Sequence, residues 1–253
     1  MQKKVSDYIA DFLAEREITQ IFTVVGGGAM HLNHSFGHHA RLHCLYNHHE
    51  QASAMAAECY ARVHGQLAVV CVTSGPGAIN ALNGVVGAYQ DSIPMLVISG
   101  QAKRDLSIHG CGGQIRSIGG QEVDIVPAVQ QNMTKYAVMV MEPERIRYEL
   151  EKALYLAREG RPGPAWLDIP LDVQGAFIET DTLAGYVPPA APAKTDVTEA
   201  ARQVLARLRQ AERPVLYAGN GIRWAGGMEL FRRLYGALDI PVVTCWDLSL
   251  IHI

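Results

Sequence analysis

The sequence has few of the features that mark secreted, membrane-spanning or nucleic-acid-binding proteins. Its 253 residues include five cysteines, and none of these forms a C-x-x-C pair, so the pattern does not indicate a disulfide framework. No apolar run approaches the about 20 residues that cross a bilayer. A formal net charge of −3 provides no basic surface for nucleic acid or anionic lipid. We therefore expect a cytoplasmic globular protein with reduced thiols and with neither a nucleic-acid nor a membrane partner.

Amphipathic segments alternate with short, unbroken apolar segments along most of the chain. Apolar residues recur at helical spacing over residues 4–16, which predicts a helix with one buried face. Residues 18–25 and 67–74 are instead short apolar segments, each closed by a glycine turn. Apolar strands separated by helices are typical of a parallel sheet covered on both faces. The sequence therefore predicts an α/β fold with a doubly wound parallel sheet.

A Pro/Ala-rich segment at residues 179–195 has the composition of an interdomain linker. We expect a first domain over residues 1–178 and the start of a second, Rossmann-like α/β domain over residues 196–253. About 60 residues are too few for a complete doubly wound domain. The second domain is therefore expected to be incomplete.

One candidate site lies where a predicted strand meets a helix, at residues 47–51 (NHHEQ). The helix is rich in alanine, so it can pack closely and bring Glu50 to the carboxyl edge of the sheet, where ligands of open α/β sheets bind. A carboxylate in that position can exchange a proton with a bound ligand. The alternative is a solvated glutamate that only favours the positive end of the helix dipole. Position alone leaves both interpretations open.

Two glycine turns form a second candidate site, at residues 26–28 (GGG) and 74–77 (SGPG). A turn of this kind presents free N–H groups and a surface of small residues to a flat or anionic ligand. Neither turn is a nucleotide fingerprint, because the Walker Lys-Ser/Thr and the full G-x-G-x-x-G spacing are both absent. Tight connections that bind nothing are the alternative.

Seven of the ten histidines lie between His31 and His49, which suggests a metal cluster. They have no cysteine or carboxylate at ligand spacing, so we expect surface and turn histidines and no metal site. His49 is different because it directly precedes Glu50. It is the one histidine expected to influence that glutamate or to contact a ligand.

Taken together, residues 49–101 resemble the pyrimidine-binding domain of the acetolactate synthase family of thiamine-diphosphate enzymes. The resemblance rests on H-E-Q, A-x-x-A-x-x-Y-A-R, T-S-G-P-G-x-x-N and D-S-I-P-x-L-x-I-S-G-Q, which follow one another in the family's order. It extends further along the chain. RPGPAWLDIPLDVQ is similar to the segment that closes the family's first domain, and RPVLYAGNGIRWAG to the opening of its central domain.

This resemblance implies that Glu50 is the catalytic residue. Its carboxyl group would hydrogen-bond to N1′ of the cofactor's aminopyrimidine and so promote removal of the proton from C2 of the thiazolium ring. Two family glutamines close to the substrate correspond to Gln101 and Gln121. The resemblance also assigns further cofactor contacts, namely Gly26, Gly27, Thr73, Pro76 and Asn80.

The family's activity implies a carboligase or decarboxylase that acts on a 2-oxo acid such as pyruvate with a carbonyl acceptor, as a homodimer or homotetramer. In the family, a G-D-G motif and a following Asn in a third domain hold Mg²⁺ and the diphosphate. This sequence contains no G-D-G, so we expect an N-terminal fragment that is inactive alone. The resemblance leaves FAD binding open. Two alternatives also stay open, a non-catalytic fragment or subunit that dimerises through this domain, and an unrelated nucleotide-binding protein.

Three departures from the family pattern lie near the expected acceptor position. Val25 stands where the family often has proline, and Gly120 replaces a common aromatic residue. The segment 103–118 is longer than in biosynthetic members. The acceptor therefore stays open between a second 2-oxo acid and a bulkier keto sugar.

Overall fold

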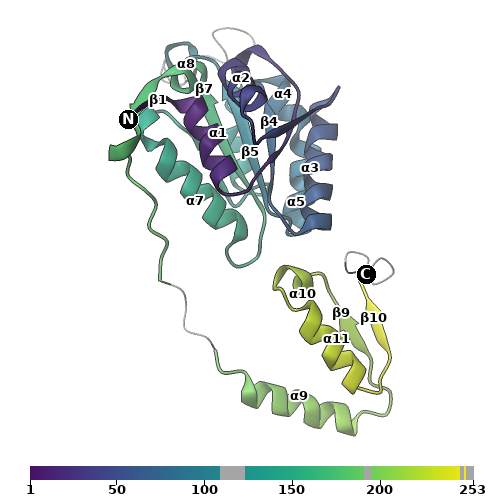
Figure 1. Ribbon diagram of the computed structural model, residues 1–253. Helices are drawn as coiled ribbons and strands as arrows, with labels where there is room; N and C mark the ends of the chain where they lie inside the picture. The colour runs from purple at the N-terminus through teal and green to yellow at the C-terminus, as the bar shows by residue number, and fades with distance from the viewer. Residues whose placement is uncertain (109–122, 191–194, 246–247, 249–253) are drawn as a thin grey trace. The chain divides into compact units, whose positions relative to one another are not determined.

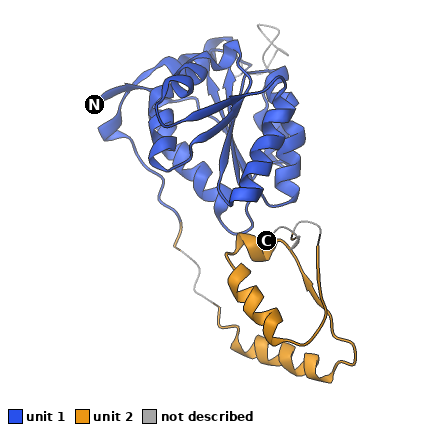
Figure 2. Cartoon of the chain, turned by 45° about the vertical axis from the view of Figure 1, so that its right-hand side comes forward, with its two compact units in different colours: residues 1–188 blue, residues 189–253 orange. Residues whose placement is uncertain are grey.

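The computed structural model describes residues 1–108, 123–190, 195–245 and 248. The chain forms two compact units, Met1–Pro188 and Pro189–Ile253 (Figure 2). The first unit is built on a six-stranded parallel sheet with the strand order β3-β2-β4-β5-β7-β6. Its strands are β2 (Gln20–Thr23), β3 (His43–Tyr46), β4 (Ala68–Val72), β5 (Met95–Gln101), β6 (Tyr136–Met139) and β7 (Pro164–Pro170).

Helices cover both faces of this sheet (Figure 1). One face carries α1 (Val5–Glu15), α2 (Met30–His38) and α7 (Ile146–Arg158), and the other carries α3 (Glu50–His64) and α5 (Leu82–Gln90). The shorter helices are α4 (Pro76–Asn80), α6 (Val126–Gln130) and α8 (Leu171–Gly175), with 3-10 turns η1 (Gly27–Ala29), η2 (Arg104–Leu106), η3 (Pro143–Arg145) and η4 (Thr180–Thr182). The predicted doubly wound α/β fold is confirmed.

The central strands are apolar on both sides because both of their faces are covered. Every residue of β4, β5 and β7 is buried, as expected for parallel strands between two helical layers. On the α5 side, Gly84 lets α5 approach α3 closely, because a Cβ there would lie 2.6 Å from the backbone carbonyl carbon of Ala54. The alanines of α3 and this glycine therefore bring α3 against the sheet and its neighbour.

The order of the strands creates a topological switch point between β2 and β4. The chain passes from β2 outward to the edge strand β3 and then returns to β4 on the other side of β2. The connections that leave β2 and β4 therefore run in opposite directions, and ligands of such sheets bind at the carboxyl ends of the strands at this point. The glycine turn after β2 and the turn at residues 73–77 both lie at this edge.

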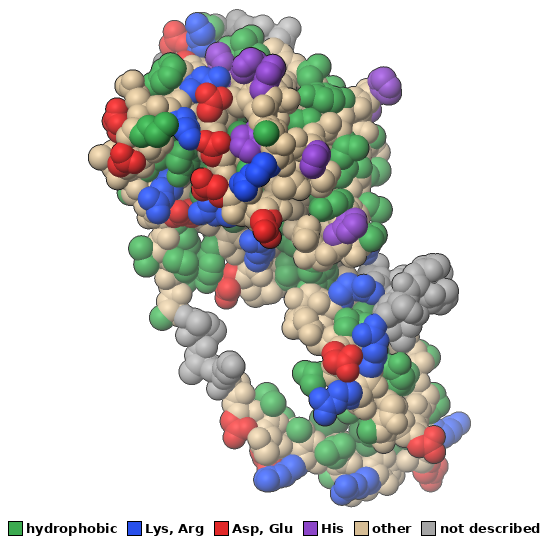
Figure 3. Space-filling model, viewed as in Figure 1, with side chains coloured by type: hydrophobic (Ala, Val, Ile, Leu, Met, Phe, Trp, Pro, Cys, Tyr) green, Lys and Arg blue, Asp and Glu red, His purple; other side chains and the backbone are tan. Residues whose placement is uncertain are grey.

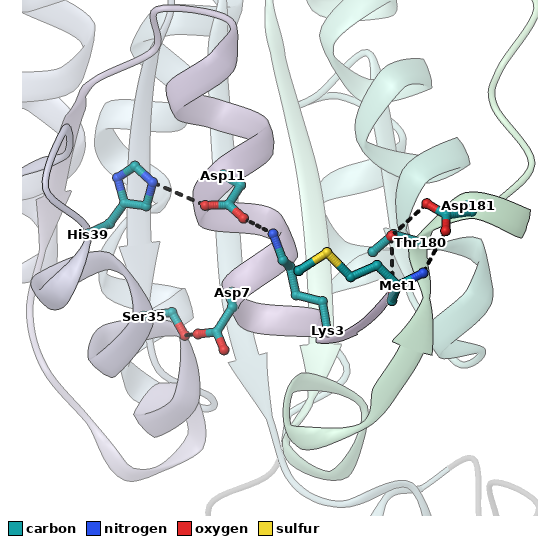
Figure 4. A network of polar contacts seen from close by, with 8 residues as sticks. All are labelled: Met1, Lys3, Asp7, Asp11, Ser35, His39, Thr180 and Asp181. Carbon is teal, nitrogen blue, oxygen red and sulfur yellow. Dashed lines mark hydrogen bonds and ion pairs between the residues drawn. The ribbon is translucent and has the colours of Figure 1, made fainter.

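A small antiparallel pair closes the first unit. Strand β1 (Gln2–Lys4) pairs with β8 (Phe177–Glu179), so the two ends of the unit lie side by side. Polar contacts extend this junction (Figure 4). The N-terminal ammonium group lies 2.6 Å from Asp181 Oδ2, and Lys3 contacts Asp11, which in turn lies 3.2 Å from His39 Nε2.

Residues 180–186 lie within the segment whose composition suggested a linker, and they pack on α7. The backbone N–H of Tyr186 donates to Glu151 Oε2 at 2.7 Å. Its ring lies between those of Tyr148 and Tyr155, with centroid separations of 5.5 and 5.7 Å. This part of the segment is therefore ordered against the first unit.

The second unit resumes the alternation of helices and strands. It contains α9 (Thr198–Gln210), β9 (Leu216–Ala218), α10 (Gly221–Trp224), α11 (Met228–Ala237) and β10 (Val242–Thr244). Strands β9 and β10 are parallel, and the unit's core is formed by Ala218, Phe231 and Leu248. Within the described part of the chain, no helix is both long and apolar enough to cross a membrane.

Candidate functional site

Glu50 is the first residue of α3, directly after the edge strand β3. The preceding residue, His49, has an extended backbone (φ −153°) and caps the helix, because its Nδ1 accepts a hydrogen bond from the backbone N–H of Gln51 at 3.1 Å. This cap pairs one of the free N–H groups in the first turn of α3, the turn that begins with Glu50. His49 therefore holds the backbone of the helix at the residue that follows Glu50.

The two oxygens of the Glu50 carboxylate have different surroundings. Oε2 accepts a hydrogen bond of 3.0 Å from Asn80 Nδ2, at the end of α4. Oε1 faces Gly77, where a Cβ atom would lie 3.3 Å away. No hydrogen bond to Oε1 occurs within the part of the chain that the structure describes. One oxygen is therefore oriented by the protein, and the other is open to a ligand beside a residue without a side chain.

The turn after β4 packs directly on the glycine turn after β2. Thr73 Oγ1 accepts a hydrogen bond of 3.0 Å from the backbone N–H of Gly28. A Cβ on Gly26 would lie 2.5 Å from Thr73 Cβ, a distance that no real pair of carbons adopts, so Gly26 cannot carry a side chain here. Gly75 has φ +61°, which lets the chain turn sharply into α4.

The structure gathers the predicted cofactor residues at one edge of the sheet. Glu50, Gly26 and Thr73 follow the carboxyl ends of β3, β2 and β4, three adjacent strands. Asn80 contacts Glu50 directly, and Pro76, an exposed residue, begins α4 between them in the chain. Gly27 is exposed, and a Cβ at this position would have no atom within 4 Å.

Gln101, expected near the substrate, lies at the end of β5 with 1% of its surface exposed. Its Nε2 donates to Asp168 Oδ2 and to the carbonyl oxygen of Val123, both at 2.9 Å, and its Oε1 accepts from the backbone N–H of Ala102 at 3.0 Å. The amide is thus fully engaged inside the protein. Gln121 lies outside the described residues, as do Gly120 and Cys111.

Asp168 is a fully buried carboxylate at the centre of this internal network. Ser99 Oγ donates to its Oδ1 at 2.6 Å and accepts from Trp166 Nε1 at 2.7 Å. Buried polar groups of this kind need such partners, since an unpaired one is costly. Trp166 has no exposed surface and belongs to the core.

The histidines of the N-terminal third are dispersed over α2 and the surrounding turns. The rings of His34 and His38 lie 4.3 Å apart, and His39 contacts Asp11. Burial lowers the pKa of His31, with smaller contributions from Lys4 and His34. Among the described residues, no group of three or more His, Cys, Asp or Glu side chains could hold a metal ion.

Two residues that the sequence did not single out also contact the glycine turn. Gly100 of β5 and Gln174 of α8 both lie against the carbonyl of Gly28. Their contacts join segments more than 70 residues apart, so no local pattern could reveal them. Gln174 falls in the D-I-P-L-D-V-Q segment, which the sequence identified only as the end of the first domain.

A parallel α/β sheet with a carboxylate and two glycine turns at its switch point is typical of a ligand-binding domain. Family comparison then identifies the cofactor. Residues 3–129 match the model of the thiamine pyrophosphate enzyme N-terminal TPP binding domain, and residues 201–247 match that of the thiamine pyrophosphate enzyme central domain. Thiamine pyrophosphate is the same compound as thiamine diphosphate. The chain belongs to the family of thiamine pyrophosphate enzymes.

Curated relatives agree with this assignment. The chain is 34% identical over 243 residues to the acetolactate synthase large subunit of Lactococcus lactis, and 35% identical over 250 residues to chloroplastic acetolactate synthase 1 of Zea mays. It is 31% identical over 245 residues to the large subunit of acetolactate synthase isozyme 3 of Escherichia coli. These alignments cover 94%, 96% and 94% of this chain but only 40%, 37% and 40% of the relatives.

Proposed function

We propose that the chain provides the pyrimidine half of the cofactor site in a thiamine-diphosphate-dependent carboligase or decarboxylase. Its donor substrate would be a 2-oxo acid such as pyruvate, and its second substrate a carbonyl acceptor. The observation that carries this proposal is the Glu50 carboxylate, with Oε2 held by Asn80 and Oε1 open beside Gly77.

The residues around Glu50 fit the flat pyrimidine end of the cofactor. Gly26 and Gly77 both pack against Thr73 at distances that exclude a Cβ, so the two turns lie close together beside Glu50. Thiamine diphosphate supplies an electron sink for cleavage of the bond next to a carbonyl. The protein supplies orientation and a site for one proton.

Glu50 Oε1 would hold that proton against a ring nitrogen of the pyrimidine. Asn80 fixes the carboxylate by binding its other oxygen, so the free oxygen keeps one direction. This is the arrangement expected of a general acid and base.

We further propose that a second copy of the chain covers an exposed apolar face on α3 and α4. Met55, Val63 and Ile79 are 46%, 73% and 45% exposed, and Cys59 is exposed between the first two on α3. Figure 3 shows apolar side chains along the edge formed by α3. Exposed apolar groups on one face are typical of association surfaces. The assembly would be a homodimer or homotetramer.

The diphosphate and Mg²⁺ would be held by a part of the enzyme that corresponds to the remaining length of the relatives.

The four cysteines in the described residues, Cys44, Cys59, Cys71 and Cys245, are all free thiols. Free thiols support the reducing environment of a cytoplasmic enzyme. We propose no FAD-binding residues in this chain.

The test is the substitution Glu50→Gln in a polypeptide that also contains the diphosphate-binding half. Decarboxylation of pyruvate should fall about 10²- to 10⁴-fold, the usual contribution of a general acid or base, while thermal denaturation stays that of the unaltered protein. Glu58→Gln is the control, because Glu58 lies two turns further along the same helix, in a partly buried ion pair with Arg62. A Glu50→Gln protein that turns over pyruvate at the unaltered rate would contradict the proposed role.

Two other interpretations predict different results. A non-catalytic subunit would give no decarboxylation when the diphosphate-binding half is added in trans, although it would still dimerise. If the acceptor is a keto sugar, carboligation should need that sugar, and product from pyruvate alone would exclude this requirement.

A further inference from the structure

Side chains hold both polar backbone groups of Gly28, the last glycine of the turn after β2. Its N–H donates to Thr73 Oγ1 at 3.0 Å, and its carbonyl oxygen accepts from Gln174 Nε2 at 2.7 Å. Thr73 comes from the end of β4 and Gln174 from α8, more than 100 residues further along the chain. Two parts of the first unit that are distant in the sequence therefore hydrogen-bond to this turn.

Gln174 is fully buried, and its amide has a specific pair of partners. Nε2 donates to the carbonyl oxygens of both Gly28 and Ile169, each at 2.7 Å, while Oε1 has no hydrogen-bond partner. An unpaired buried oxygen is costly, and few such atoms occur in a folded protein. The two hydrogen bonds that Nε2 donates must offset the cost of the unpaired Oε1. We therefore infer that the Gln174 amide stabilises the glycine turn.

Few other hydrogen-bond donors can reach the carbonyl oxygen of Gly28. A Cβ on Gly100 of β5 would lie 2.0 Å from Gly28 O, so the turn rests directly on the backbone of β5. Asn33 of α2 approaches the carbonyl of Gly26, but at 3.5 Å this contact is too long to order the turn strongly. Figure 1 shows α2, α4 and α8 around the same end of the sheet. Gln174 is thus the main side-chain donor to the turn.

We propose that Gln174 is a positioning residue of the cofactor site. By fixing the carbonyl of Gly28 it holds the glycine turn against Thr73, at the sheet edge where Glu50 also lies. A turn fixed in this way is ready to receive the pyrimidine of thiamine diphosphate without first becoming ordered, which favours binding. This inference rests on the proposed function, since it names the ligand that the turn receives.

The test uses Gln174→Met, which keeps the length and volume of the side chain but removes both donors. In the complete enzyme, hydrogen exchange of the backbone over residues 24–30 should become faster, and the Kd for thiamine diphosphate in saturating Mg²⁺ should rise about tenfold or more. The control is Thr134→Val, because Thr134 is buried beside edge strand β6 and its hydroxyl donates to the carbonyl of Val129 at 3.0 Å. It should leave both quantities unchanged.

Each result has a defined meaning. Unchanged exchange over residues 24–30, or faster exchange with an unchanged Kd, would overturn the proposal. If Gln174→Met does not fold, Gln174→Asn replaces it, because this variant keeps the amide but shortens its reach to Gly28. If the unaltered enzyme binds no thiamine diphosphate while exchange still rises in the variant, the proposed function fails instead, and the turn's dependence on Gln174 stands.

Discussion

Asn80 Nδ2 lies 3.0 Å from Glu50 Oε2, and this hydrogen bond joins the last residue of α4 to the first residue of α3. It leaves only one oxygen of the carboxylate free. Since α3 and α4 follow different strands, the orientation of Glu50 depends on how both strands sit in the sheet. Activity should therefore respond to changes that move either helix.

Removing the amide of Asn80 should weaken activity without unfolding the protein. Asn80→Ala leaves Glu50 free to rotate, and the loss of a hydrogen bond to a charged group corresponds to about tenfold or more in rate. Steady-state kinetics on the complete enzyme would measure this. Asn83→Ala is the matched control, because Asn83 is exposed on α5. Equal kcat values for the two variants would argue against an orienting role for Asn80.

Adding one methyl group to Gly84 should destabilise the first unit. The new Cβ would lie 2.6 Å from both Ala54 Cβ and the Ala54 carbonyl carbon, so α3 and α5 must separate. We expect Gly84→Ala to lower the free energy of unfolding by about 1–3 kcal/mol, as measured by urea denaturation. Gly87→Ala, in the same helix with no atom within 4 Å, should raise it by up to about 1 kcal/mol. Similar changes in both variants would contradict this account.

Asp172 should contribute to stability at neutral pH but not in acid. Partial burial tends to raise its pKa, but hydrogen bonds from the side chain and backbone of Arg104 outweigh this and hold the pKa below its ordinary value. A pKa lowered by folding contributes stability above the unfolded value of about 3.9, and this stability is lost as the pH falls through the folded pKa.

We therefore expect Asp172→Asn to lower the urea midpoint at pH 7, with the difference from the unaltered protein shrinking below about pH 4. Asp105→Asn is the control, because Asp105 is exposed on η2. A difference for Asp172→Asn that is the same at pH 7 and pH 3 would show that the carboxylate's charge is not the cause.

Cys71 should resist alkylation while the protein is folded. Burial in β4 raises the pKa of its thiol to about 12, so it stays protonated at pH 8, and it has no exposed surface. In a single, unassembled copy of the chain Cys59 is exposed on α3 and should react with iodoacetamide well before Cys71. Peptide mass spectrometry after a short pulse would then show label at Cys59 and none at Cys71. Equal early labelling of Cys71 would mean that β4 opens far more often than its burial suggests.

Local patterns in the sequence were enough to predict the sheet, its two helical layers and the position of Glu50. Apolar strands between helices require a parallel sheet, and parallel strands place their carboxyl ends at one edge. Residues that follow different strands, such as Gly26, Glu50 and Thr73, are then expected at that edge, and the order of the strands in the structure brings these three together. The resemblance to known enzymes named the cofactor, which no pattern of apolar residues could do.

Only the tertiary structure decided which groups in that neighbourhood are free and which are occupied. The amide of Gln101 donates its hydrogen bonds to Asp168 and Val123 inside the protein, whereas the amide of Gln174 donates to the glycine turn. The pairing of β1 with β8 likewise joins the two ends of the first unit. Side chains and short strands of this kind can make many hydrogen bonds with similar energies, so their partners are chosen by the packing of segments far apart in the chain rather than by neighbouring residues.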